Sequence, residues 1–209
     1  MVLIYIGDLF NMVKIVKTKV KFFCPITIYD TEIINDISRP DSSYWDYEKG
    51  DICVAGFLMG NEIIQVIHEH NGDLEEFKKQ LWEILKDKKD LYSFNFRFEH
   101  EITKGLLGKS IFISEIKSFK GKNFGKERFF IELVKDKKVK KKEIPKDPFN
   151  GNGGLCMEKW KEGKIDEILE HNRSCLIEEY FLFINKQYLY DKFKNNIKDG
   201  WFQENDKKM

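Results

Sequence analysis

Two carboxylates stand one residue apart near the front of the chain, at the end of an apolar segment. Residues 26–32 read ITIYDTE and predict a strand that ends in Asp30 and Glu32. Residues i and i+2 of a strand point to the same face, roughly 7 Å apart. Such a pair can share divalent cations, because hard ions prefer carboxylate oxygens. Most acids at strand ends simply face water, so this pair needs support from other segments.

Two later segments carry further residues that suit a metal-dependent site. In SFNFRFEHEI, residues 93–102, Asn95 ends a predicted strand and Glu99 begins the next helix. In GKIDEILEHNRSCLIEEY, residues 163–180, His171 and Cys175 lie one turn apart on the same helix face. Each residue also has an ordinary structural explanation: Asn95 can satisfy backbone groups at a strand end, Glu99 can stabilise the first turn of a helix, and His171 can be a half-buried helix histidine.

The three motifs together, in this order, resemble those of the ribonuclease H-like 3'-5' exonucleases of the DEDD type. Within that superfamily the chain is most similar to the predicted exonucleases of the YprB type, which carry a DIET-like strand, a YNGxxFD-like junction and a closing HNRxD-like helix. Here YDTE occupies residues 29–32 and HNR occupies residues 171–173, after a short helix and a glycine turn at residues 160–163. The likeness spans residues 26–183. It implies an α/β fold, a ribonuclease H-like mixed sheet flanked by helices.

The resemblance also assigns roles to the site residues. Asp30 would bridge two metal ions, Glu32 would hold the ion nearer the attacking water, and Glu99 would hold or position the other. His171 would orient or deprotonate that water. The fourth metal ligand, an aspartate in the family, aligns with Cys175. The implied cofactor is Mg²⁺ or Mn²⁺, and the implied reaction is hydrolysis of phosphodiester bonds in DNA or RNA.

Cys175 is the serious departure from the family pattern. A thiol with a pKa near 8.5 is mostly neutral at about pH 7, and Mg²⁺ prefers hard oxygen. Three acids then supply a charge of about −3 against the +4 of two magnesium ions, so the second metal site should be weaker. Glu178 and Glu179, one turn onward, are expected to be surface charges. A slow, one-metal or inactive enzyme is therefore an open alternative to a normal exonuclease.

The charge of the chain is unevenly distributed. Residues 117–142 hold eleven Lys or Arg and three Asp or Glu, which gives +8, so the remainder of this chain of net charge +1 carries −7. A basic segment on an acidic body suits a protein that meets phosphates on one surface and cations on another. A solvated lysine-rich loop explains the same charges equally well. The expected nucleic-acid contacts are Asn95, Arg173, Lys137, Lys138, Lys140, Lys141 and Lys142.

The length of 209 residues suits one domain, with a core over residues 20–193 and a flexible basic segment over residues 117–150. The glycines of residues 151–154 match no phosphate-binding fingerprint and are read as a connector. The expected elements are an early strand at residues 1–6, strands over 21–28, 52–59, 62–68, 91–95 and 110–116, and helices over 74–85, 98–107, 155–162 and 165–193. Residues 129–134 fit a strand or a short helix. A Gly60–Asn61 turn predicts that residues 52–59 and 62–68 form a hairpin.

Neither the cysteines nor the N-terminus suggests another class of protein. Cys24, Cys53, Cys156 and Cys175 form no pair at zinc-ligand or redox spacing, which favours a reducing, cytoplasmic setting. The opening MVLIYI is too short for a membrane span and lacks the shape of a signal peptide. The expected partner is the single-stranded end of a nucleic acid, with no membrane. Two hypotheses compete with the enzyme: a nucleic-acid-binding relative that has lost catalysis, and a protein-interaction domain.

Overall fold

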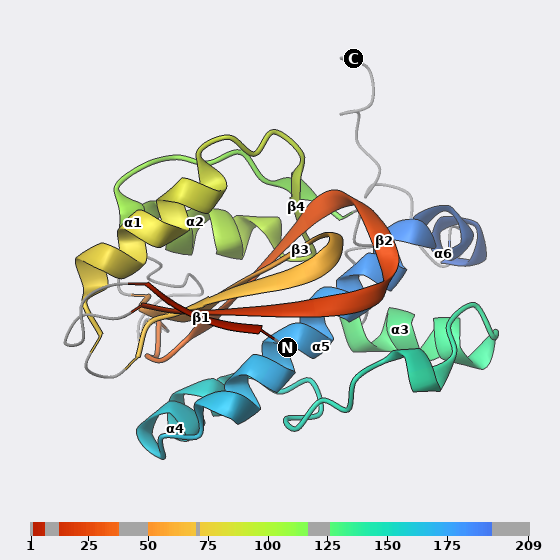
Figure 1. Ribbon diagram of the computed structural model, residues 1–209. Coiled ribbons are helices and arrows are strands. Elements are labelled where there is room, and N and C mark those ends of the chain that lie inside the picture. The colour runs from red at the N-terminus through yellow and green to blue at the C-terminus, as the bar shows by residue number, and fades with distance from the viewer. Residues whose placement is uncertain (1, 7–12, 38–49, 70–71, 117–125, 194–209) are drawn as a thin grey trace.

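The protein has an α/β architecture built on a mixed five-stranded sheet (Figure 1). The structure, a computed structural model, describes residues 2–6, 13–37, 50–69, 72–116 and 126–193. The strands are β1 (Val2–Ile6), β2 (Val13–Ile33), β3 (Ile52–Ile67), β4 (Leu91–Ser93) and β5 (Ser114–Glu115). The α/β class predicted from the sequence, with helices flanking a mixed sheet, is confirmed.

Strand β2 is the centre of the sheet. It pairs antiparallel with β3 along its length, antiparallel with β1 over residues 13–17, and parallel with β4 at Thr27 and Ile28. Strand β5 pairs parallel with β4. Residues 27–32 of β2 are all buried, since layers of helix cover both faces of this stretch. The predicted strand that ends in Asp30 and Glu32 is therefore confirmed, and it lies in the middle of the sheet.

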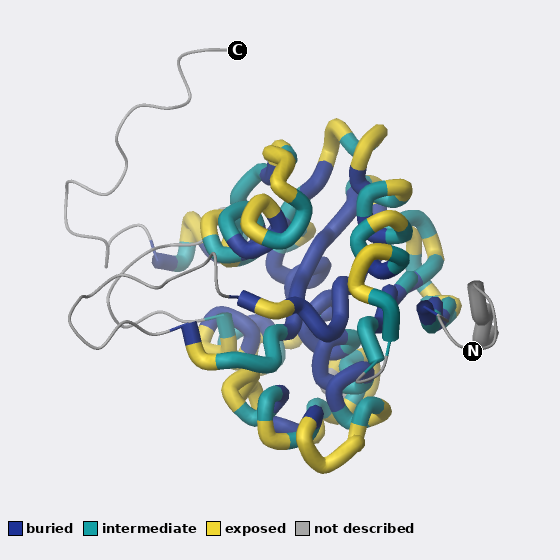
Figure 2. Tube along the Cα trace, turned by 90° about the vertical axis from the view of Figure 1, so that its left-hand side faces the viewer, coloured by how far each residue is buried: buried dark blue, intermediate teal, exposed yellow. Residues whose placement is uncertain are grey.

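Two layers of helix enclose the sheet. Helices α1 (Leu74–Leu85) and α2 (Phe96–Leu107) cover one face. The other face is covered by α3 (Lys126–Lys135), α5 (Ile165–Ile184) and α6 (Lys186–Phe193), with α4 (Cys156–Lys161) packed against the start of α5. Two short 3₁₀ turns, η2 (Lys141–Glu143) and η3 (Gly153–Leu155), lie between α3 and α4. Figure 2 shows the buried strands between these helices.

Local sequence signals place several of these elements correctly. Asp73 caps α1 by accepting hydrogen bonds from the backbone N–H groups of Glu75 and Glu76, as its position before an amphipathic repeat predicts. Helix α2 ends at Gly108, whose φ of 63° is the left-handed conformation that commonly closes helices. The predicted strand over residues 110–116 is shorter in the structure, where β5 covers two residues.

The predicted hairpin at Gly60–Asn61 is wrong. Strand β3 runs without reversal from Ile52 to Ile67, and Gly60, at a φ of 58°, lies at an irregularity opposite Cys24. The positive φ bends the strand instead of turning it back. Residues 62–67 pair with residues 14–19 at the start of β2, a strand segment not predicted from the sequence.

Three other boundaries also differ from prediction. The segment over residues 117–150 is not uniformly flexible, since residues 126–135 form α3, which buries Phe129, Phe130 and Leu133. Residues 117–125 lie outside the described residues. The final helix is two helices, α5 and α6, which meet at Asn185. The sheet begins at β1, before the predicted core boundary at residue 20.

Helix α5 crosses the sheet at unusually short range beside Gly56. Gly56 is the β3 partner of Asp30, and a Cβ atom built on it would lie 2.0 Å from Asn172 Oδ1 and 2.8 Å from Leu176 Cδ1 on α5. The absence of a side chain at this position lets Asn172 reach the strand that carries Asp30. The contact fixes the height of the helix above the sheet.

We expect Gly56→Ala to lower the free energy of unfolding by about 2–3 kcal/mol, because overpacking forces shifts in a close-packed interior. Thermal and denaturant unfolding followed by circular dichroism would measure this loss. Gly163→Ala is the matched control, since its φ of 71° is strained for alanine but a Cβ there meets nothing within 4 Å. The control should lose only about 1 kcal/mol. Equal losses in the two variants would contradict a steric role for Gly56.

Candidate metal centre

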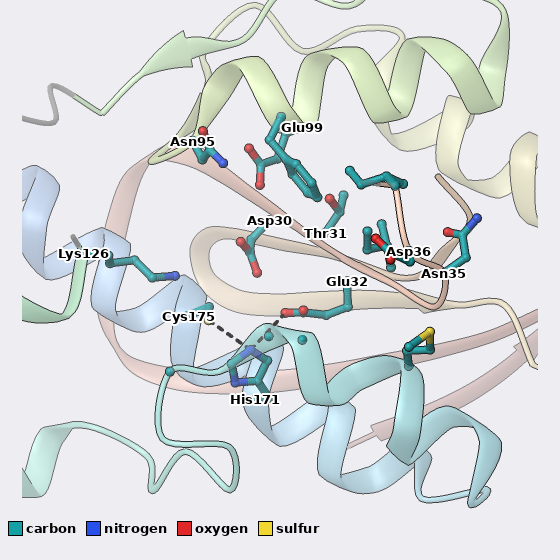
Figure 3. A pocket seen from close by; sticks show the side chains of 17 residues that line it. Asp30, Thr31, Glu32, Asn35, Asp36, Asn95, Glu99, Lys126, His171 and Cys175 are labelled. Atoms are coloured by element: carbon teal, nitrogen blue, oxygen red, sulfur yellow. Dashed lines mark hydrogen bonds and ion pairs between the residues drawn. The ribbon is translucent and has the colours of Figure 1, made fainter. Parts of the chain in front are cut away.

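A cleft of about 740 Å³ opens at the end of β2, between the start of α2, the start of α3 and the middle of α5 (Figure 3). It collects most of the acids and the histidine singled out from the sequence. Its lining residues are Asp30, Thr31, Glu32, Ile33, Asn35, Asp36, Ile37, Asn95, Phe98, Glu99, Lys126, Gly151, Gly153, Gly154, Met157, His171 and Cys175. Residues far apart in the chain therefore meet at one site.

Asp30 and Glu32 are both buried, and a side-chain amide holds them in place. Asn172 Nδ2 donates to Asp30 Oδ2 at 2.9 Å and, at 3.5 Å, to Glu32 Oε1. Gln65 Nε2 donates in turn to Asn172 Oδ1 at 3.0 Å, which fixes the orientation of the amide with its NH₂ group toward the acids. Asn172 and Gln65 were not identified as site residues from the sequence.

Glu99 lies in the first turn of α2 and faces the same cleft. Its side chain is buried, and its Oε2 atom has no hydrogen-bond partner among the described residues. Burial, and next the charges of Asp30 and Glu179, raise the pKa of Glu99 well above its ordinary value. Asn95, the residue before α2, also lines the cleft, and its side chain makes no capping hydrogen bond within the described structure.

The ligand atoms of Asp30, Glu32 and Cys175 lie within 4.8 Å of one another, a spacing that suits a bound metal ion. Burial, followed by repulsion from Asp30, raises the pKa of Glu32 well above its usual range. Burial likewise raises the pKa of Cys175, so its thiol is neutral and a poor ligand for Mg²⁺. Glu99 faces this group across the cleft without belonging to it. The donors fit one hard cation at Asp30 and Glu32, with Glu99 offering its unpartnered oxygen nearby.

Lys126 supplies the positive charge nearest to these acids. It is the first residue of α3, it lines the cleft, and its Nζ lies 3.3 Å from Glu179 Oε1. Burial favours the neutral amine, but the charges of Glu179, Asp30 and other nearby acids outweigh it and hold the pKa of Lys126 well above its ordinary value. Glu179 is fully buried, which corrects the expectation that it is a surface charge.

His171 is oriented by a carboxylate on one side and faces the acids on the other. Its Nδ1 lies 2.8 Å from Asp147 Oδ1, and its Nε2 lies 3.8 Å from Glu32 Oε1 and 3.8 Å from Cys175 Sγ. Burial opposes ionisation of Asp147, but hydrogen bonds from Phe149, His171 and Gly151 outweigh it and lower its pKa. Ionised Asp147 therefore accepts the Nδ1 proton. The tautomer with its proton on Nδ1 presents the lone pair of Nε2 to the cleft.

The expected nucleic-acid contacts are only partly gathered at the cleft. Asn95 lines it, whereas Arg173 is paired with Glu170 on α5 and is not a lining residue. The lysines Lys137, Lys138, Lys140, Lys141 and Lys142 follow the C-terminal end of α3, while Lys126 stands at its N-terminal end. A ten-residue helix is about 15 Å long, so α3 separates the start of this basic run from Lys126 by about that length.

Some of the residues missed had a usable signal in the sequence and others had none. Asn172 lies beside His171 in the HNR motif and one turn before Cys175, so helical spacing alone predicts that it faces the sheet with them. Lys126 was counted only as part of the basic segment. Asp147 lies in a Pro- and Gly-rich connector where no periodicity indicates which side chain points inward.

No family model, curated protein or solved structure matches the chain. Among the described helices, none combines the length and the apolar character needed to cross a membrane.

The raised pKa values of the buried acids predict that the stability of the fold decreases as pH rises. Burial raises the pKa of Glu179 from 4.5 to about 8, and Glu32 and Glu99 shift in the same direction. The folded protein then holds protons that the unfolded chain has released, so the free energy of unfolding falls as pH rises between about 5 and 8. Without metal, the melting temperature should be higher at about pH 5.5 than at about pH 8, and MnCl₂ should raise it more at the higher pH.

Glu99→Gln should flatten this pH dependence, because the amide carries no proton to lose. Glu158→Gln, an exposed acid of α4 outside the cleft, is the matched control and should leave the slope unchanged. A melting temperature of the metal-free protein that rises from about pH 5.5 to about pH 8 would contradict this account of the acids.

Proposed function

We propose that the protein is a metal-dependent 3'-5' exonuclease of the ribonuclease H-like type, which hydrolyses phosphodiester bonds in DNA or RNA. The observation that carries the proposal is the meeting of Asp30, Glu32, Glu99 and His171 in one cleft. These residues come from three motifs spread over more than 140 positions of the chain. A mixed sheet with the two leading acids on its central strand agrees with the resemblance seen in the sequence.

The residues of the cleft would have different roles in hydrolysis. Asp30 and Glu32 would hold Mg²⁺ or Mn²⁺, which when bound supplies a Lewis acid and lowers the pKa of a coordinated water. Nε2 of His171 would accept the proton of the attacking water, while Asp147 stabilises the resulting imidazolium through Nδ1. Lys126 lies on the side of the cleft that carries Cys175, and it would stabilise negative charge on the scissile phosphate from there.

The partner in this proposal is the single-stranded end of a nucleic acid. A cleft of about 740 Å³ has room for a terminal nucleotide, and the basic run after α3 would contact the backbone farther along the strand. Contacts of this kind add affinity and salt dependence without reading sequence.

A second candidate is a nucleic-acid-binding relative with impaired catalysis. Cys175 favours it, because a neutral thiol at the fourth ligand position weakens the binding of a second hard cation. Binding to nucleic acid without cleavage would select this candidate. In that case, alanine at the five lysines after α3 should flatten the dependence of affinity on salt concentration.

The direct test is incubation of end-labelled single-stranded and duplex DNA and RNA with Mg²⁺ or Mn²⁺. We expect stepwise release of nucleotides from the 3' end, abolished by EDTA and by Asp30→Asn, because the substitution removes a charged metal ligand. Glu158→Gln, the same change of charge outside the cleft, should retain activity. Cleavage that survives Asp30→Asn would assign the activity to a contaminant and would contradict the proposal.

The ligand position at residue 175 can be tested separately from turnover. Cys175→Asp adds a hard oxygen donor beside Asp30 and Glu32, so Mn²⁺ should bind about tenfold more tightly, equivalent to about 1.4 kcal/mol. Isothermal titration calorimetry measures this, with Cys175→Ala as the variant that removes sulfur without adding oxygen. Unchanged affinity in the aspartate variant would mean that α5 contributes no ligand from this position.

A further inference from the structure

Glu32, Cys156 and His171 form a second group of candidate ligands, which shares Glu32 with the first. One ligand atom from each residue lies within 4.8 Å of the other two, and all three side chains are buried. They come from β2, α4 and α5 respectively. The group is chemically different from the acids beside it, since it combines a thiol, an imidazole and one carboxylate. We propose that it is a binding site for Zn²⁺.

The spacing of the three donors agrees with the size of a zinc site. Zinc binds sulfur at about 2.3 Å and nitrogen or oxygen at about 2.0–2.1 Å, so ligand atoms in a tetrahedral site are about 3.5 Å apart. Cys156 Sγ lies 3.2 Å from Glu32 Oε2, and His171 Nε2 lies 3.8 Å from Glu32 Oε1. One ligand atom from each residue lies within 4.8 Å of the other two, so side-chain adjustments of up to about 1 Å would place all three around one ion.

The surroundings of His171 are those of a metal-binding histidine. Zinc-ligating imidazoles usually donate their second ring N–H to a carboxylate, which fixes the tautomer and the ring. Here Asp147 accepts from Nδ1 at 2.8 Å and is itself held by the backbone N–H groups of Phe149 and Gly151. Nε2 is thereby left facing Glu32 and the cleft, from which an ion can enter. Water would complete the shell, as in zinc sites that have three protein ligands.

The donor set selects the metal. A thiolate and an imidazole favour zinc strongly over magnesium, which takes oxygen ligands and gives up its waters reluctantly. Binding would release the Cys156 thiol proton to solvent. The oxygen ligands of Asp30 and Glu32 remain a better site for Mg²⁺ than the group that contains Cys156.

The two sites share Glu32, so zinc binding would regulate the nuclease. This inference rests on the proposed function. An ion held by Glu32 and His171 would take one ligand from the hard-cation site and would occupy the nitrogen proposed to accept the proton of water. Zinc should therefore inhibit the nuclease at concentrations far below those of the Mg²⁺ that supports it.

Co²⁺ titration of the metal-free full chain tests the site directly, because cobalt replaces zinc and its bond to thiolate absorbs in the near ultraviolet. We expect a sulfur-to-cobalt charge-transfer band that saturates at one ion and disappears on addition of Zn²⁺. Cys156→Ser should remove the band and weaken zinc binding at least about tenfold. Cys24→Ala, a buried thiol of the core outside the cleft, should retain both. An absent band, or one that persists in Cys156→Ser, would overturn the proposal.

X-ray absorption of the zinc-loaded wild-type protein tests the site without relying on variants that must fold. It should show one sulfur at about 2.3 Å among nitrogen and oxygen ligands, and a shell without sulfur would also overturn the proposal. The outcome is independent of the nuclease assay. Failure to cleave nucleic acid with Mg²⁺ or Mn²⁺ would contradict the proposed function and leave the cobalt result standing, whereas cleavage that Zn²⁺ does not inhibit would contradict the shared use of Glu32.

Discussion

The concentration of negative charge beside one buried stretch of β2 is the constraint on which the rest of the site depends. Asp30, Glu32 and Glu99 are withdrawn from water in one cleft, where burial and the charge of Asp30 disfavour ionisation of Glu32 and Glu99. Only protons, a fixed cation or a bound metal ion can offset such a charge. Lys126 supplies a single fixed positive charge, and its partner Glu179 takes up part of it. The remaining charge is the physical reason to expect a divalent cation.

The side chains of the site are held by hydrogen bonds between segments far apart in the chain. Because Gly56 has no side chain, α5 lies close to the sheet and Asn172 donates hydrogen bonds to Asp30 and Glu32. Gln65 fixes the orientation of the Asn172 amide. Asp147 reaches His171 from the connector before α4 in the same way. Prior orientation of ligands and proton acceptors lowers the reorganisation required during a reaction.

Local patterns were sufficient to predict the elements that carry the acids. The strand that ends in Asp30 and Glu32, the cap at Asp73 and the helix that begins at Glu99's turn all follow from periodicity and side-chain chemistry within a few residues. The prediction at Gly60 was wrong because a glycine–asparagine pair indicates a reversal of the chain only where no distant strand offers better pairing. Here the start of β2 pairs with residues 62–67, so β3 continues. Lys126 and Asp147 were missed for the same reason, because their roles arise only when segments distant in the chain are packed together.

The central claim is that Asp30 and Glu32 capture a hard divalent cation, and anomalous diffraction from crystals of the full chain soaked in MnCl₂ tests it most directly. The account predicts a manganese peak within ligand distance, about 2.0–2.4 Å, of a carboxylate oxygen from each of these residues, with Glu99 reached directly or through water. Manganese absent from the cleft, or bound only at surface acids elsewhere, would contradict the claim.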